Sequence, residues 1–192
     1  MARLEPNLSL HDALKNSYKP LHDSKRMMLN RGYYLDKKLS NHNEQIYWKP
    51  TEKKLLMTIA GTHNIRDWGT DVYLALGKIK DTNRYKESDS ILKQAKQKYN
   101  PKNTTVAGHS LGGTIAGYIT SKAGGDKAIT LDAGYTIGQK TRSNTDAYRS
   151  KGDIVSLLGS GTTRMKTLQN QPSQNPLRAH DIGNIKNEKI LV

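Results

Sequence analysis

Short apolar runs separated by polar turns follow a helical N-terminal segment, and this pattern predicts a series of strands. Met1–Arg31 has the pattern of mostly helical structure, with Ser9 as a helix cap. Gly32–Leu35, Gln45–Trp48 and Leu55–Ala60 then have the pattern of strands separated by turns. We therefore expect a β-meander after the first helices.

Apolar residues at every third or fourth position predict two helices after the meander. The first covers Asp67–Lys80 and the second Ser88–Tyr99, with a loop at Asp81–Tyr85 between them. Lysines occupy the other face of the second helix, where they are most simply a solvated surface.

The second half of the chain predicts further buried strands. Ala128–Leu131 has the pattern of a buried strand, and Ala147–Arg149 that of a short one. Residues 159–174 are polar and read as irregular, and Ile190–Val192 reads as an edge strand. Neither an internal repeat nor a linker divides the sequence, and 192 residues suit one domain spanning 1–192.

Thr104–Gly117 is the most informative stretch. A β-branched and apolar run leads to Ser110, which Gly108 and Gly112 flank, and a helical pattern begins at Leu111. Small residues on both sides allow a sharp strand–turn–helix with the serine hydroxyl exposed at its tip. The Leu111 N–H would then face a negative charge that forms on a bound carbonyl. The alternative is a tight turn with an ordinary serine.

A serine nucleophile needs a base, and the histidines differ in how well they fit that role. In the chain order of α/β-hydrolases the acid and then the histidine follow the serine, which favours His180. His63 precedes the serine and reads as part of a loop. His109 adjoins Ser110 and is expected to point away from it, as a packing or supporting residue.

The sequence offers several aspartates as the acid that orients the base. Asp153 follows a strand candidate and a glycine, where such an acid belongs, and Asp132 at the end of a strand is the second choice. Asp181 adjoins His180 and cannot easily reach the far nitrogen of its ring. The other aspartates after the serine are Asp126 and Asp146.

A second oxyanion donor is expected where the third predicted strand ends, at Ala60–Asn64. Gly61 allows the backbone to approach a ligand closely. Thr62 is the candidate donor, through its backbone N–H and with its hydroxyl as an additional donor. A helix-capping threonine is the alternative, and both roles can hold together.

Composition narrows the class of partner but does not select one. The chain has 31 basic and 17 acidic residues, a net charge of +14. A basic surface is attracted to anionic lipid, at about 1 kcal/mol for each residue that comes close, or to nucleic acid without sequence preference. The sequence sets no oligomeric state.

Composition also excludes some kinds of site and segment. The absence of cysteine excludes disulfides and thiolate metal sites. Neither a secretory signal nor an apolar run of ~20 residues is visible, so a cytoplasmic or virion-associated location is expected.

Gly32–His180 resembles the class 3, or fungal-lipase-like, α/β-hydrolases. The segments that carry the resemblance are Leu55–Asp71, Gly108–Gly113, Gly152–Val155 and Ala179–Asp181. The resemblance implies an α/β fold of the α/β-hydrolase type, with a mostly parallel central sheet, helices on both faces and a nucleophile elbow. It also implies a triad of Ser110, Asp153 and His180, oxyanion donors at Thr62 and Leu111, and hydrolysis of acylglycerols or phospholipids without metal or cofactor.

The chain departs from this family at two places. Ala60 stands where the family usually has a basic residue. Asn64–Trp68, which matches a mobile apolar lid, is short and carries Arg66 and Asp67. Compact forms of this kind resemble lipase-like proteins of large DNA viruses.

Three functional hypotheses follow. The first is a serine hydrolase of lipid esters that forms an acyl-enzyme. The second is a catalytically silent hydrolase fold that binds anionic membrane or nucleic acid through its basic surface. The third is a thioesterase or peptidase with the same triad, because fold and triad do not fix the acyl substrate.

Overall fold

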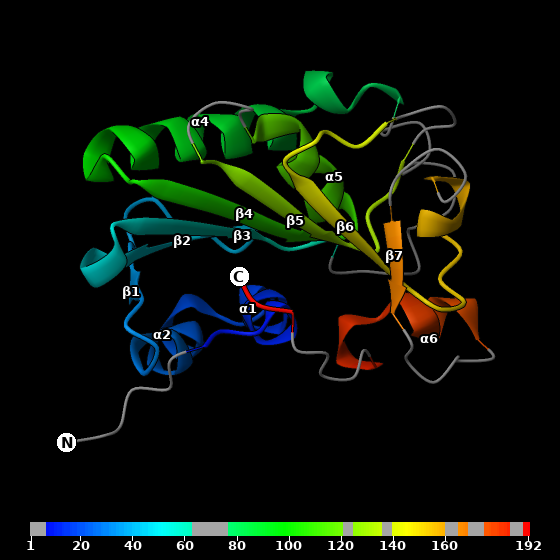
Figure 1. Ribbon diagram of the computed structural model, residues 1–192, viewed down its shortest axis with the longest axis horizontal. Helices are drawn as coiled ribbons and strands as arrows, with labels where there is room; N and C mark the ends of the chain where they lie inside the picture. The colour runs from blue at the N-terminus through cyan, green and yellow to red at the C-terminus, as the bar shows by residue number, and fades with distance from the viewer. Residues whose placement is uncertain are drawn as a thin grey trace.

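A seven-stranded sheet in the order β1 to β7 lies at the centre of the computed structural model (Figure 1). The structure describes residues 7–62, 77–120, 125–135, 140–159, 165–168, 175–184 and 190–192. The strands are β1 (Tyr34–Leu35), β2 (Glu44–Lys49), β3 (Lys54–Ile59), β4 (Asn103–His109), β5 (Lys127–Leu131), β6 (Thr145–Ser150) and β7 (Met165–Leu168).

The pairing of neighbouring strands changes once across the sheet, from antiparallel to parallel. The pairs β1–β2 and β2–β3 are antiparallel, which confirms the predicted meander. From β3 to β7 every neighbouring pair is parallel. The sheet is therefore mostly parallel, and the carboxyl ends of β3 to β6 meet at one edge, where ligand sites of α/β folds form.

Helices cover both faces of the sheet. In Figure 1, α4 and α5 lie above it, and α1 and α2 lie below it. The α-helices are α1 (Leu10–Ser17), α2 (Leu21–Leu29), α4 (Asn83–Tyr99), α5 (Leu111–Ile119) and α6 (Pro176–His180). Short 3-10 helices are η1 (Pro50–Glu52), η3 (Ile79–Asp81), η4 (Ser156–Gly159) and η5 (Ile182–Asn184). The arrangement confirms the expected α/β-hydrolase architecture.

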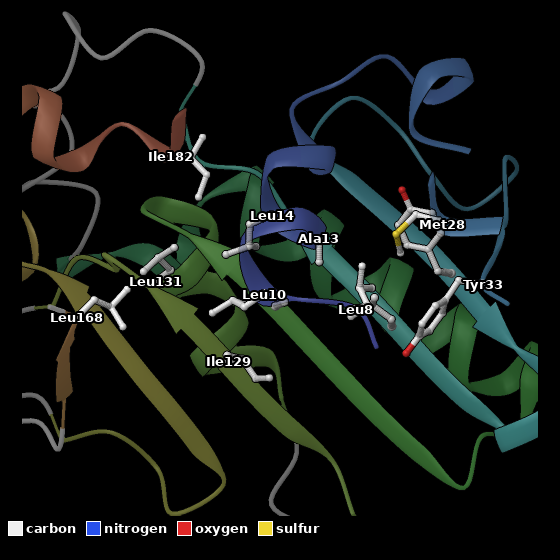
Figure 2. Close-up of a cluster of buried hydrophobic side chains, with 13 residues drawn as sticks. Leu8, Leu10, Ala13, Leu14, Met28, Tyr33, Ile129, Leu131, Leu168 and Ile182 are labelled. Carbon is white, nitrogen blue, oxygen red and sulfur yellow. The ribbon is translucent and has the colours of Figure 1, made fainter. Parts of the chain in front are cut away.

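The two faces of the sheet have separate cores, because neighbouring residues of a strand point to opposite sides. Leu56, Ala107 and Ile129 pack against α1 and α2, a cluster shown in Figure 2. Leu55 and Val106, one position earlier on the same strands, pack against α4 and α5. Because both faces are covered, these strands are continuous apolar runs in the sequence, and those runs predicted the buried strands correctly.

Helix boundaries follow capping chemistry. Ser9 caps α1 as expected, since its Oγ accepts a hydrogen bond from the Asp12 N–H at 3.1 Å. The helix predicted over Ser88–Tyr99 begins earlier, at Asn83, because Thr82 caps it and accepts from the Tyr85 N–H. The expected loop at Asp81–Tyr85 is therefore mostly helix.

Two further segments differ from the prediction. Strand β7 lies inside the stretch predicted to be irregular, where it pairs with β6 at the sheet edge. Its four residues are too few, and its middle two too exposed, for an alternating pattern to stand out. Leu191 forms an isolated bridge with Ser9 instead of an edge strand of the sheet.

Several expectations fall outside the described residues. They are His63, the lid-matching segment Asn64–Trp68 and most of the helix predicted over Asp67–Lys80. Among the helices that the structure describes, none has both the length and the apolar character needed to cross a membrane.

Candidate active site

Ser110 stands on a sharp turn between β4 and α5. Its φ of 59° and ψ of −127° are unusual for a residue with a side chain, and such a backbone costs roughly 1–3 kcal/mol. Both positions that flank the serine, 108 and 112, require glycine because a Cβ there would collide with the backbone. A Cβ at Gly108 would lie 2.2 Å from the Gly112 carbonyl oxygen, and one at Gly112 would lie 2.3 Å from the Ile59 oxygen. The predicted strand–turn–helix is confirmed.

Ser110 and His180 line one small cavity. The cavity has a volume of about 40 Å³, and Thr62 and Tyr18 also line it. Ser110 is 1% exposed, and within the described part of the chain its Oγ has no hydrogen-bond partner. A nucleophilic hydroxyl and an imidazole thus share a site from which most solvent is excluded.

Asp153 holds the His180 ring. Its Oδ1 lies 2.8 Å from His180 Nδ1, and its Oδ2 accepts a hydrogen bond from the Ser156 N–H at 2.9 Å. Burial alone would raise the pKa of Asp153, but the hydrogen bonds from His180 and Ser156 outweigh it and lower the pKa below the ordinary value. The carboxylate therefore stays charged beside the imidazole.

Asp132, the second candidate acid, lies next to this pair but is bound elsewhere. Both of its oxygens accept hydrogen bonds from Ser150, at 2.5 Å from the N–H and 2.7 Å from Oγ. Burial, and then the charge of Asp153, raise the pKa of Asp132 well above its ordinary value. These contacts favour Asp153 as the partner of the histidine.

The two predicted oxyanion donors lie at the ends of neighbouring strands. Leu111 is the first residue of α5, where N–H groups have no acceptor within the helix. Thr62 follows the end of β3, and the peptide that carries its N–H is held from the other side, because Arg84 donates to the Gly61 oxygen at 3.4 Å. Arg84 also donates to the Ala60 oxygen. A guanidinium from α4 thus binds the carbonyl oxygens of two successive residues just after β3.

His109 belongs to the support of the site, as the sequence predicts. Its Nδ1 lies 2.6 Å from the Tyr18 hydroxyl and its Nε2 lies 3.0 Å from the His180 carbonyl oxygen. Burial, assisted by the charge of His180, lowers the pKa of His109 to about 3. It is therefore a neutral ring at physiological pH.

His109 and His180, together with Asp132, form the one group among the described residues whose spacing resembles a metal site. His109, Asp132 and His180 each offer an atom within 4.8 Å of the others. However, both nitrogens of His109 are in hydrogen bonds, and Ser150 binds both oxygens of Asp132. The cluster is a hydrogen-bonded network, and its donors do not fit a metal ion.

Comparison with known families agrees with this geometry. A model of the phospholipase-like family, described as a Tle-like phospholipase domain, matches residues 6–187. The chain belongs to the phospholipase-like family. No curated protein sequence matches it at a significant level.

Solved lipase structures share the fold of this phospholipase-like chain. Lip2 lipase from Yarrowia lipolytica superposes with a TM-score of 0.57 at 16% identity, over 92% of this chain and 86% of the lipase. A Rhizomucor miehei lipase–propeptide complex gives 0.52 at 14% identity, over 83% and 65% of the two chains. A triacylglycerol lipase described as having a serine protease triad gives 0.53 at 16% identity, over 84% and 78%. The fungal-lipase-like fold is thus confirmed, and family and fold together support hydrolysis of lipid esters.

Sequence reasoning missed two residues of this phospholipase-like site, Tyr18 and Arg84. Tyr18 follows α1 and Arg84 lies in α4, and they are 43 and 23 residues away along the chain from Gly61, which both contact. Neither lies in a motif, so only the packing of α1 and α4 on the sheet brings them in.

Proposed function

We propose that the chain hydrolyses carboxylic esters of lipids through Ser110, His180 and Asp153. One observation carries the proposal: Ser110 and His180 line the same cavity while Asp153 binds the far nitrogen of the histidine ring. A carboxylate that accepts from Nδ1–H leaves Nε2 as the basic nitrogen of the neutral ring.

Each residue then has a defined step. Ser110 Oγ attacks the acyl carbonyl carbon as its proton moves to His180, and Asp153 balances the charge of the imidazolium. The oxyanion accepts hydrogen bonds from the Leu111 and Thr62 N–H groups. The alcohol leaves with the proton of His180. Water then attacks the acyl carbon while the same ring takes its proton, and the ring returns that proton to Ser110 Oγ as the fatty acid leaves.

Acylglycerols and phospholipids are the proposed substrates, with phospholipids favoured. The family is phospholipase-like, and the net charge of +14 attracts anionic lipid surfaces. We further infer one domain for residues 1–192. In support, the Leu10 N–H donates to the Ile190 oxygen at 2.7 Å, which joins the N-terminal and C-terminal segments.

A panel of p-nitrophenyl esters of graded chain length, with and without anionic phospholipid vesicles, tests the proposal. Ser110→Ala should lose at least a thousandfold of the wild-type turnover, while Ser90→Ala, an exposed serine on α4, should keep it. Equal turnover by wild type and Ser110→Ala would refute the site. Salt-dependent binding to vesicles or DNA without turnover of any ester would instead support the silent binding protein.

A further inference from the structure

A chain of hydrogen bonds runs through residues that line the cavity and begins at Tyr18, the residue that follows α1. The Gly61 N–H donates to the Tyr18 hydroxyl oxygen at 2.6 Å. The same hydroxyl lies 2.6 Å from His109 Nδ1, and His109 Nε2 lies 3.0 Å from the His180 carbonyl oxygen. The chain therefore joins the end of β3 to the backbone of the histidine.

The direction of each hydrogen bond follows from the groups present. A carbonyl oxygen only accepts, so His109 Nε2 must carry the proton. Because His109 is neutral, its Nδ1 is then an acceptor, and the Tyr18 O–H donates to it. The Tyr18 oxygen remains to accept from Gly61. Every member has a compatible donor or acceptor, which fixes one tautomer of His109.

The backbone of Gly61 packs closely against both the Tyr18 hydroxyl and the side chain of Ser110. A Cβ at Gly61 would lie 2.6 Å from this hydroxyl and 2.8 Å from Ser110 Cβ. Gly61 is thus wedged between the two side chains, with Tyr18 on its N–H and Arg84 on its carbonyl oxygen. The next peptide N–H is that of Thr62, so any shift of Gly61 moves the proposed oxyanion donor.

The other end of the chain supports His180. This residue ends α6, a helix of five residues, which is too short to be stable in isolation. Its position depends on contacts with the rest of the fold, among them Nδ1 with Asp153 and the carbonyl oxygen with His109. The first sets the ring and the second sets the backbone that carries the ring.

We propose that Tyr18 is a positioning residue whose hydroxyl holds the Gly61–Thr62 turn and, through His109, the backbone of His180 in one fixed arrangement. The proposal rests on the proposed function, because it assigns these two elements to the oxyanion hole and the base. Tyr18 contacts no reacting atom in this scheme. Its effect is on the geometry in which the transition state is stabilised, where small displacements are costly.

Tyr18→Phe tests this role, with Tyr99→Phe as the matched control. Tyr99 is also partly buried, and its hydroxyl donates to Asp36 Oδ2 at 2.8 Å, at the C-terminal end of α4 and away from Gly61 and His109. We expect Tyr18→Phe to lower kcat at least tenfold with KM within twofold, per active site titrated with a phosphonate ester. Tyr99→Phe should keep kcat within twofold, although it loses its hydrogen bond to Asp36. An unchanged kcat in Tyr18→Phe, or equal losses in both variants, would overturn the proposal.

Imidazole ¹H–¹⁵N spectra of Ser110→Ala protein separate this proposal from the proposed function. We expect His109 as the Nε2–H tautomer, with His109 and His180 signals that shift when Tyr18→Phe is added and not when Tyr99→Phe is added. An Nδ1–H tautomer, or signals that do not respond to Tyr18→Phe, would contradict the hydrogen-bond chain. If the wild type turns over no ester, the proposed function fails, while these spectra still decide whether Tyr18 positions the two histidines.

Discussion

Asp153 Oδ1 and His180 Nδ1 lie 2.8 Å apart, although the two residues are 27 positions apart in the chain. Both side chains are almost completely buried. A charge-assisted contact of this kind, shielded from water, is much stronger than the same contact at a surface. It orients the histidine toward the cavity that Ser110 shares.

The choice between two acids gives the first prediction. Asp153→Asn should lower kcat about 10³–10⁴-fold, because an amide stabilises the wrong tautomer and no longer balances the imidazolium. Asp132→Asn should keep kcat within about tenfold, since a raised pKa makes Asp132 resemble a neutral amide. Steady-state hydrolysis of a p-nitrophenyl ester by both variants measures the difference. The reverse order of the two losses would make Asp132 the triad acid.

The glycines of the elbow give a prediction about stability. Gly112→Ala should lower the free energy of unfolding by about 1–3 kcal/mol, because its Cβ would meet the backbone oxygen of Ile59 at 2.3 Å. Gly117→Ala on the same helix has no heavy atom within 4 Å of its Cβ, and should raise stability by up to about 1 kcal/mol. Urea denaturation of both variants checks this pair, and equal effects would show that the elbow is not closely packed.

The strained backbone of Ser110 predicts a further difference. Ser110→Gly and Ser110→Ala should both be inactive, but the glycine variant should be the more stable by about 1 kcal/mol. Glycine relieves the cost of a positive φ, whereas alanine retains it. Thermal unfolding of the two variants measures this difference. An alanine variant at least as stable as the glycine variant would mean that the turn stores no strain.

His109 predicts a loss of stability in acid. Its pKa is lowered from 6.5 to about 3, first by burial, so the unfolded chain binds a proton between these values and the folded protein does not. Stability is therefore complete above pH 6.5 and falls as the pH decreases toward 3, by at most about 5 kcal/mol from this group.

His109→Gln removes this titration while it retains a donor near Nε2. Its free energy of unfolding should change less between pH 7 and pH 4 than that of the wild type. The control is His22→Gln, because the His22 side chain is 78% exposed and its replacement should leave the wild-type dependence intact. Identical pH dependence in wild type and His109→Gln would contradict a neutral, buried His109.

Local sequence signals predicted the elbow and the sheet well. Ser110 lies where strand, glycine and helix patterns coincide, and the Ser9 cap and the apolar strands follow rules that span a few residues. Thr82 shows the limit of such rules. The residues after it are mostly polar, so no apolar pattern marked the start of α4 at Asn83. The short edge strand β7 was missed for the same lack of local contrast.

The rest of the site depends on contacts between distant segments. The position of Asp153 after a strand candidate and a glycine favoured it over Asp132. The separate partners of the two carboxylates, His180 and Ser150, appear only when β5 and β6 lie side by side. Tyr18 and Arg84 enter through the docking of their helices. A single sequence carries no signal for such contacts.

Reaction with an alkyl p-nitrophenyl phosphonate, followed by peptide mass spectrometry, tests the central claim most directly. In this reaction the serine Oγ bonds to phosphorus and p-nitrophenolate leaves. We predict one adduct per chain, located on Ser110, and a much slower reaction in His180→Ala. Two results would contradict the account. One is an adduct on another residue, and the other is ester hydrolysis that persists in Ser110→Ala.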